Sequence, residues 1–140
     1  MAVTGLQYFS IAVHDIEAAA ERYTKMLGLT QTTEIQDTRW GFRNCMLGIG
    51  DTNVIELISP SSPDSALARF MKMREGDAYP GGEGLYLVGF QVDDVKSTIA
   101  SAEGVGARVT TEAESPRSAW VHPASNGNVM LEFNEAAPPA

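Results

Sequence analysis

The chain has 140 residues, 44% of them hydrophobic and 20% charged, which fits one compact domain with a real hydrophobic core. Its net charge of −8 would repel nucleic-acid phosphates and anionic membranes, so we expect neither as a partner. No apolar run approaches the roughly 20 residues of a membrane helix, and no secretion signal is visible. A single cysteine, Cys45, allows no intrachain disulfide and suits a reducing compartment, so we expect a cytoplasmic protein.

The first part of the chain predicts a strand, a helix and then three more strands. β-forming residues occupy 6–13, and Asp15 is a good N-cap for a helix that follows it. Apolar residues then recur at helical spacing as far as Leu27, and Gly28 suits the C-cap. The three expected strands cover residues 30–36, 39–47 and 54–58.

The same order of elements recurs in the second part of the chain. A strand over 85–92 ends in two aspartates, and a helix with Val95 and Ile99 on one face follows. Three more strands are expected over residues 108–111, 117–122 and 129–133. Two tandem βαβββ modules predict an α+β fold, with a curved mixed sheet around a cavity and the helices outside. We place the first module at 1–58, a linker with a short helix at 59–83, the second module at 84–135 and a tail at 136–140.

Alternation along the strands indicates which side chains line the cavity. Apolar residues on one face of each strand should pack on the helices, which leaves the smaller and more polar residues for the cavity. By this argument Glu56 and Glu132 point into the cavity, because their neighbours Ile55, Leu57, Leu131 and Phe133 face the helices. In the first strand of each module the expected lining residues are Tyr8, Ser10, Leu87 and Gln91.

A carboxylate in the middle of an apolar strand costs free energy unless a metal, a proton or a donor satisfies it. Two explanations remain open for Glu56 and Glu132. Each could be hydrated at a rim or paired with an arginine such as Arg43 or Arg117. The explanation that we favour is that both line a ligand site, because the costly placement occurs in both modules.

The doubled pattern resembles the vicinal oxygen chelate family. The segments that carry the resemblance are IAVHDIEAA, NVIELISP, GFQVDDV and WVHPASNGNVMLEF. The family includes glyoxalase I, methylmalonyl-CoA epimerase, extradiol dioxygenases, fosfomycin-resistance enzymes and bleomycin-binding proteins, and the last segment looks most like the epimerase and glyoxalase branch. The resemblance implies a small organic ligand held in a cup of β-sheet, and a homodimer that covers the open sheet edges.

The resemblance also implies four metal-ligand positions, which fall here on Tyr8, Glu56, Leu87 and Glu132. The two carboxylates match the family, whereas the two positions that usually hold histidine do not. A leucine cannot coordinate a metal, and a neutral tyrosine is a poor ligand. We therefore expect no resident transition metal and no other cofactor, although a weak Mg²⁺ or Mn²⁺ site through Glu56 and Glu132 stays open.

Other candidate side chains have competing explanations. Trp40 and Trp120 are expected on the third strands, where they could stack on a ligand or belong to the core. Arg43 and Arg69 could receive a ligand anion, although a surface role is favoured for both. The remaining candidates are interpreted as structural: His14 as a solvated turn residue, His122 as part of a turn, and Cys45 as a small core residue.

Two functions fit these observations. The first is a metal-independent isomerase, epimerase or lyase, in which Glu56 or Glu132 moves a proton next to the carbonyl of a small substrate and Tyr8 donates a hydrogen bond. Repulsion between the two carboxylates in one cup would raise one pKa and make a usable base. The second is a non-catalytic protein that binds a drug or metabolite, as resistance proteins do. We favour the enzyme.

Overall fold

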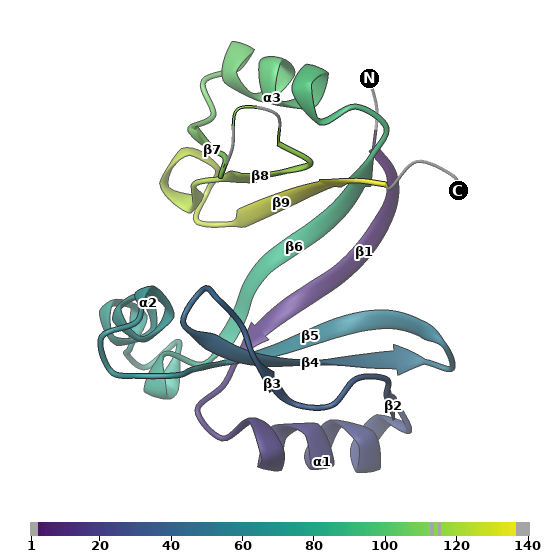
Figure 1. Cartoon of the computed structure of the whole chain (residues 1–140). Helices are drawn as coiled ribbons and strands as arrows, with labels where there is room; N and C mark the ends of the chain where they lie inside the picture. The colour runs from purple at the N-terminus through teal and green to yellow at the C-terminus, as the bar shows by residue number, and fades with distance from the viewer. Residues whose placement is uncertain (1–2, 113, 115, 137–140) are drawn as a thin grey trace. The chain divides into compact units, whose positions relative to one another are not determined.

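The computed structural model describes residues 3–112, 114 and 116–136 and has the expected α+β fold. The described residues form nine strands and three α-helices, and the order strand–helix–strands occurs twice (Figure 1). The chain divides into two compact units, Phe9–Tyr86 and Met1–Tyr8 with Leu87–Ala140. Among the described helices, none is long and apolar enough to cross a membrane.

The unit Phe9–Tyr86 packs helix α1 (Ile16–Leu27) against one face of its sheet. The strands follow the order β2–β4–β5–β1, with β3 also paired to β4, and β1 runs parallel to β5. The Asp15 carboxylate accepts the Ala18 N–H at 3.0 Å, and Gly28 closes the helix with φ 70°, as their positions in the sequence predict. The strands are β1 (Val3–Ala12), β2 (Thr30–Gln31), β3 (Gln36–Asp37), β4 (Phe42–Ile49) and β5 (Thr52–Pro60).

The segment between the two repeats carries a helix that packs on this same sheet. Helix α2 (Ala66–Arg74) begins after Ser65, whose hydroxyl accepts the Ala68 N–H at 3.1 Å. Its Leu67 and Met71 are buried against Ala12 and Ile58. Because Ile58 and Glu56 share a face of β5 by alternation, α2 covers part of the face that carries Glu56. A 3₁₀ turn, Pro80–Gly82, then leads into β6 (Gly84–Val92).

The other unit packs helix α3 (Val95–Gly104) against the strands that follow it. The strand order is β6–β9–β8–β7, and residues 3–8 of β1 lie next to β6. Asp94 caps α3 by accepting the N–H groups of Lys96 and Ser97. The strands are β7 (Val109–Thr110), β8 (Ser118–Val121) and β9 (Met130–Glu135), with a 3₁₀ turn at Pro123–Ser125 before β9.

Two of the predicted strands are wrong in detail. The strand expected over 30–36 is broken into β2 and β3, because the Thr33 hydroxyl accepts the Met46 N–H at 2.9 Å and interrupts the regular ladder. The strand expected over 39–47 begins only at Phe42, because Gly41 adopts φ 82° in a turn that also contains Trp40. Trp40 is therefore in a turn, although the sequence predicted a strand there.

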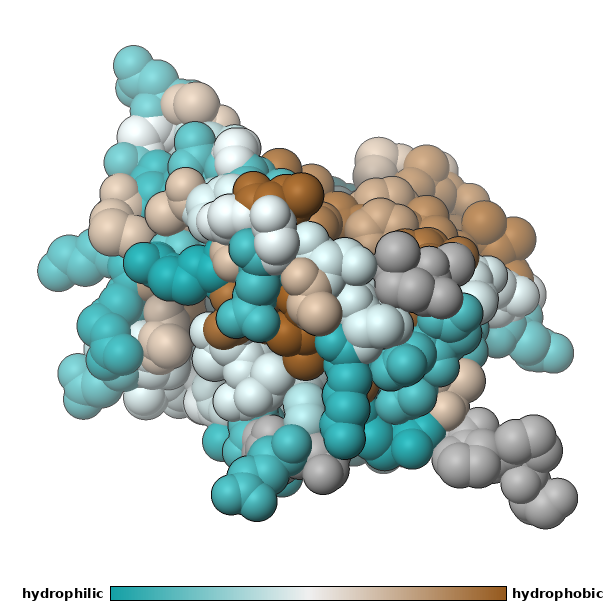
Figure 2. All heavy atoms as spheres, turned by 90° about the horizontal axis from the view of Figure 1, so that it is seen from above, coloured by the Kyte–Doolittle hydropathy of each residue, from teal (hydrophilic) through white to brown (hydrophobic). Residues whose placement is uncertain are grey.

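Several large hydrophobic side chains remain exposed. Leu6 is 56% exposed and Ile49 68%. Phe9 lies on the same face of β1 as Ile11, the apolar face that should pack on a helix, yet it is 38% exposed. Figure 2 shows hydrophobic residues gathered in brown groups among hydrophilic ones on the face it draws. A chain of this size therefore has apolar surface available for association.

Candidate functional site

Among the described residues, three neutral side chains donate hydrogen bonds to the Glu132 carboxylate on β9. The Tyr8 hydroxyl and the Asn134 amide both donate to Oε1, the amide at 2.8 Å. The Trp120 indole N–H donates to Oε2 at 2.6 Å. Trp120 lies directly opposite Glu132 in the antiparallel pair of β8 and β9, which explains why the two side chains meet. These donors to the half-buried carboxylate come from three different side chains.

A second layer of polar groups holds the Asn134 amide in place. Its Nδ2 also donates to the Gln7 side-chain oxygen at 2.8 Å, and its Oδ1 accepts from the Ser118 hydroxyl at 2.6 Å. Both ends of this amide are therefore engaged, and the network runs from β1 through β9 to β8 within one unit. Such a connected network fixes the geometry of the Glu132 carboxylate.

Tyr8 reaches Glu132 across a strand position that has no side chain. Gly89 on β6 pairs in register with Glu132. A Cβ atom added at Gly89 would stand 3.1 Å from both Cε2 and Cζ of the Tyr8 ring. The ring therefore occupies the space above Gly89, and a larger residue there would push it aside.

Glu56 on β5 carries a comparable set of contacts in the unit Phe9–Tyr86. The Ser10 hydroxyl donates to Oε1 at 2.5 Å, and the Asn44 amide donates to Oε2 at 3.0 Å. Ser10 is fully buried and pairs in register with Glu56 across the parallel strands. The Asn44 carbonyl oxygen is buried and has no hydrogen-bond partner among the described residues.

The neighbours of each carboxylate show which face of its strand it occupies. Ile55 and Leu57 pack into the core beneath α1, while Leu131 and Phe133 pack into the core beneath α3. By alternation, Glu56 and Glu132 lie on the faces opposite those helices, as the sequence predicted. That the two carboxylates open into one cavity stays a prediction.

The arginines considered as partners of these carboxylates contact other groups. Arg43 donates to Glu17 on α1 at 2.6 Å, and this hydrogen bond lowers the pKa of the Glu17 carboxyl. Arg117 donates to the Ala136 carbonyl. A ligand-binding role for Arg43 stays a prediction.

The two tryptophans differ in their surroundings. Trp120 is half-buried and bonded to Glu132, which makes it part of the polar cluster on β9. Trp40 is 48% exposed, with Phe42 stacked on its ring at 6.1 Å and the Arg39 guanidinium 4.8 Å from its centroid. A ligand-stacking role for Trp40 stays a prediction.

The histidines and the cysteine have structural contacts. The His122 ring accepts the Ala124 N–H at 3.0 Å and so caps a 3₁₀ turn. The His14 ring contacts the Gly81 carbonyl at 2.6 Å. Cys45 is fully buried, as expected of a core residue, and burial, followed by the charge of Glu56, raises its thiol pKa to about 11.

The donor set does not fit a transition metal. Leu87 is 5% exposed and offers no ligand atom, and the Tyr8 hydroxyl is engaged with Glu132. Within the part of the chain that the structure describes, no group of three or more His, Cys, Asp or Glu side chains could hold a metal ion. Zn²⁺, Ni²⁺ and Fe²⁺ favour imidazole or thiolate ligands, which these positions lack.

Gln91 on β6 lies near Gly5, and its ligand-binding role stays a prediction.

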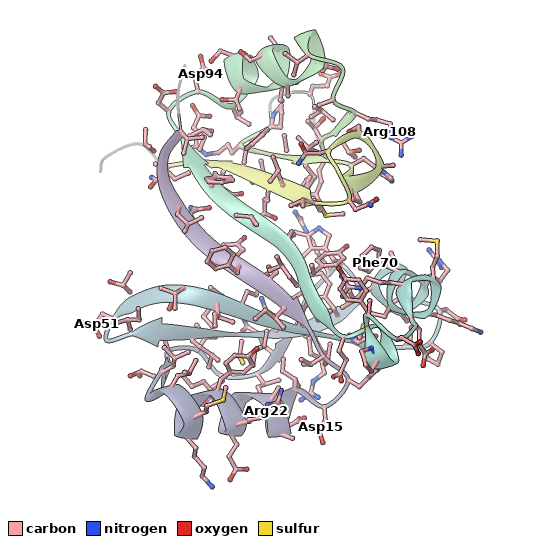
Figure 3. The ribbon with its side chains drawn as sticks, turned by 180° about the vertical axis from the view of Figure 1, so that it is seen from behind. Asp15, Arg22, Asp51, Phe70, Asp94 and Arg108 are labelled. Carbon is pink, nitrogen blue, oxygen red and sulfur yellow. The ribbon has the colours of Figure 1, made fainter. Side chains whose placement is uncertain are left out.

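A surface cavity of about 410 Å³ lies within the unit Phe9–Tyr86, beside α2. It is lined by the segment 60–63 together with His14, Lys72, Glu75 and other residues, and Glu56 is not among them. Lys72 of this lining lies on α2, the helix on which Figure 3 labels Phe70. The cavity is therefore separate from the carboxylate contacts described above.

Sequence reasoning named Tyr8, Ser10 and Trp120 as site candidates but missed the other residues that hold the two carboxylates. Asn44 and Asn134 bond directly to Glu56 and Glu132, and Gly89 gives Tyr8 its space. A signal for Asn134 was present, because a residue two positions after Glu132 shares its strand face. No local signal identified Asn44, since its approach to Glu56 depends on the register of β4 against β5.

Comparison with known proteins gives a consistent family and fold. The model of the Glyoxalase/Bleomycin resistance protein/Dioxygenase superfamily matches residues 7–122. The ethylmalonyl-CoA/methylmalonyl-CoA epimerase of Cereibacter sphaeroides is 26% identical over 93% of this chain and 96% of its own length. The mitochondrial methylmalonyl-CoA epimerase of Bos taurus is 24% identical over 94% of this chain and 74% of its own.

A solved structure is similar over nearly the whole chain. The crystal structure of methylmalonyl-CoA epimerase from Mycobacterium tuberculosis superposes with a TM-score of 0.78 at 27% identity. The match covers 97% of this chain and 90% of that one. The fold described above is therefore shared along the length of both chains.

Proposed function

This chain belongs to the glyoxalase/bleomycin resistance protein/dioxygenase superfamily, and we propose that it is an isomerase that moves a proton next to the carbonyl of a small acyl thioester. The observation that carries the proposal is the Glu132 carboxylate, half-buried on a strand and held by three donors that include the Tyr8 hydroxyl. The relatives named as acyl-CoA epimerases support the substrate class.

The proposed chemistry needs a base and a donor, and the chain offers both. A carboxylate such as Glu132 or Glu56 takes the proton from the carbon next to the carbonyl, and the negative charge passes to the carbonyl oxygen. A neutral hydroxyl close to that oxygen stabilises the charge as it develops. Tyr8 supplies such a hydroxyl beside Glu132, and Ser10 supplies one beside Glu56. No step uses a metal, because the donor set at these positions does not fit one.

The test is epimerisation of acyl-CoA thioesters that have a stereocentre next to the carbonyl. A panel with methyl, ethyl, hydroxyl and carboxyl substituents is first screened by thermal shift. The best ligands are then incubated in single enantiomeric form and resolved by chiral chromatography. Racemisation by the wild-type protein, cut about 10²-fold or more by Glu132→Gln or Glu56→Gln, supports the proposal. Tight binding with no racemisation of any member contradicts it and supports a ligand-sequestering protein instead.

A further inference from the structure

We propose that Tyr8 and Glu132 work as one hydrogen-bonded pair, in which the Tyr8 hydroxyl follows the negative charge from the carboxylate to the substrate oxygen. We further infer that Gly89 is the positioning residue that holds Tyr8 in place. This inference rests on the proposed function and adds to it how base and donor are coupled. The observation behind it is the contact of the Tyr8 hydroxyl with Glu132, made across the bare position of Gly89.

Of the three donors to Glu132, only Tyr8 can redirect its hydrogen without moving heavy atoms. The indole N–H of Trp120 is fixed in the plane of its ring. The Asn134 amide is held at both ends, by the oxygen of Gln7 and by the hydroxyl of Ser118. The phenol O–H rotates about the C–O bond, so it can turn from one acceptor to another while the ring stays in place.

The direction of that rotation follows from where the charge lies. In the resting state Glu132 is the charged acceptor, and a hydrogen bond to a charged oxygen is roughly twice as strong as a neutral one. When the substrate C–H bond breaks, its proton forms an O–H bond on Glu132 and its electron pair becomes the enolate. The carboxyl is then neutral and the substrate oxygen is charged, so the Tyr8 hydroxyl gains by turning to it. The hydroxyl returns to Glu132 when the enolate carbon has taken up a proton and the Glu132 carboxyl has lost its own; proton uptake on the opposite face of the carbon gives the epimer.

The position of the Tyr8 ring decides whether its hydroxyl can serve both acceptors. Gly89 and Glu132 are paired in register, and the ring lies over the glycine. A Cβ at 3.1 Å from Cε2 and Cζ is tighter than ordinary van der Waals contact, so alanine would push the ring by a few tenths of an ångström. Gly5, on the neighbouring strand of the same unit, offers a matched control. A Cβ there would come no closer than 3.7 Å, to the Gln91 side-chain oxygen.

The experiment compares Tyr8→Phe, Gly89→Ala, their double variant and Gly5→Ala with the wild-type protein. The first readout is exchange of the acyl α-hydrogen with solvent deuterium, followed by NMR with the acyl-CoA ester that the wild type racemises best. We expect Tyr8→Phe to lower kcat by about 10²-fold or more, the scale of a lost oxyanion donor. Gly89→Ala should lower kcat by roughly 10-fold with little change in KM, because displacements near 1 Å cost about 10²-fold. Gly5→Ala should exchange as the wild type does.

The decisive outcome is the double variant. If Gly89 acts only through the Tyr8 hydroxyl, Gly89→Ala costs nothing further once Tyr8→Phe has removed that hydroxyl. The second readout is the Kd of an acyl-CoA nitronate, a stable anion that shares part of its negative charge with the thioester carbonyl oxygen, as the enolate does. Tyr8→Phe should weaken it about 10-fold or more and leave the affinity of the neutral acyl-CoA unchanged. Additive losses in the double variant, or Tyr8→Phe with more than a third of wild-type kcat, overturn the inference while the proposed function stands. Absence of exchange in the wild-type protein overturns both.

Discussion

The indole of Trp120 provides a test of the Glu132 cluster that needs no substrate. Trp120→Phe removes the N–H that donates to Glu132 Oε2 at 2.6 Å, and it keeps most of the aromatic surface of a half-buried side chain. A hydrogen bond to a charged group contributes about 1.5–3 kcal/mol to stability. Glu132 keeps its bonds from Tyr8 and Asn134, so we expect the lower end of that range, about 1.5 kcal/mol.

The assay is urea unfolding followed by circular dichroism, with a double-mutant cycle against Glu132→Met, a change that removes all three bonds to the carboxylate. A direct interaction predicts a coupling free energy of about 1 kcal/mol between Trp120→Phe and Glu132→Met. Trp40→Phe is the matched control, because Trp40 is 48% exposed, and its cost should stay within about 0.5 kcal/mol. A coupling free energy below about 0.3 kcal/mol would refute the reasoning that the indole holds the carboxylate.

Three further outcomes are expected. The thiol of Cys45 has its pKa raised to about 11, so it should react with an aromatic disulfide reagent at pH 8 only as fast as the chain opens. The Cys45 thiol loses its proton at a lower pH in the unfolded chain than in the folded chain. Burial of the neutral thiol therefore contributes to stability below about pH 9, and this contribution is lost as the pH rises towards 11. A native thiol that reacts fully at pH 8 would argue against its burial. Elemental analysis after expression in metal-supplemented medium should find no stoichiometric transition metal. One metal per chain that is lost on Glu132→Ala would contradict the conclusion that the positions of Tyr8 and Leu87 do not support a metal site. Sedimentation should give a homodimer of the 15.0 kDa chain, consistent with exposed residues such as Leu6 and Ile49, and a monomer at micromolar concentration contradicts this.

The repeat could be predicted from the sequence because each of its parts has a local signal. Asp15 and Asp94 cap their helices as N-cap residues do, and alternation placed Glu56 and Glu132 on the faces away from α1 and α3. The interruption between β2 and β3 could not be predicted, because it depends on a bond from the Met46 N–H to the Thr33 hydroxyl thirteen residues away.

The partners of the carboxylates were also harder to predict, because they lie far from the carboxylates along the sequence. Tyr8 lies 124 positions from Glu132, and their meeting depends on β1, β6 and β9 lying side by side. Strand alternation placed Tyr8 on the cavity face, but it could not show that Tyr8 meets Glu132. The importance of Gly89 follows from the space it leaves, and a missing side chain gives no sequence signal of its own.

The most direct test of the account is the exchange of acyl α-hydrogen with solvent deuterium by the wild-type protein, beside Glu132→Gln and Glu56→Gln. The account predicts exchange in the wild type and a loss of about 10²-fold or more in at least one of the two variants, with acyl-CoA binding and the unfolding midpoint largely retained. Wild-type protein that binds an acyl-CoA without exchanging its α-hydrogen contradicts the account. Exchange that survives both substitutions at the wild-type rate contradicts the assignment of the carboxylates as the base.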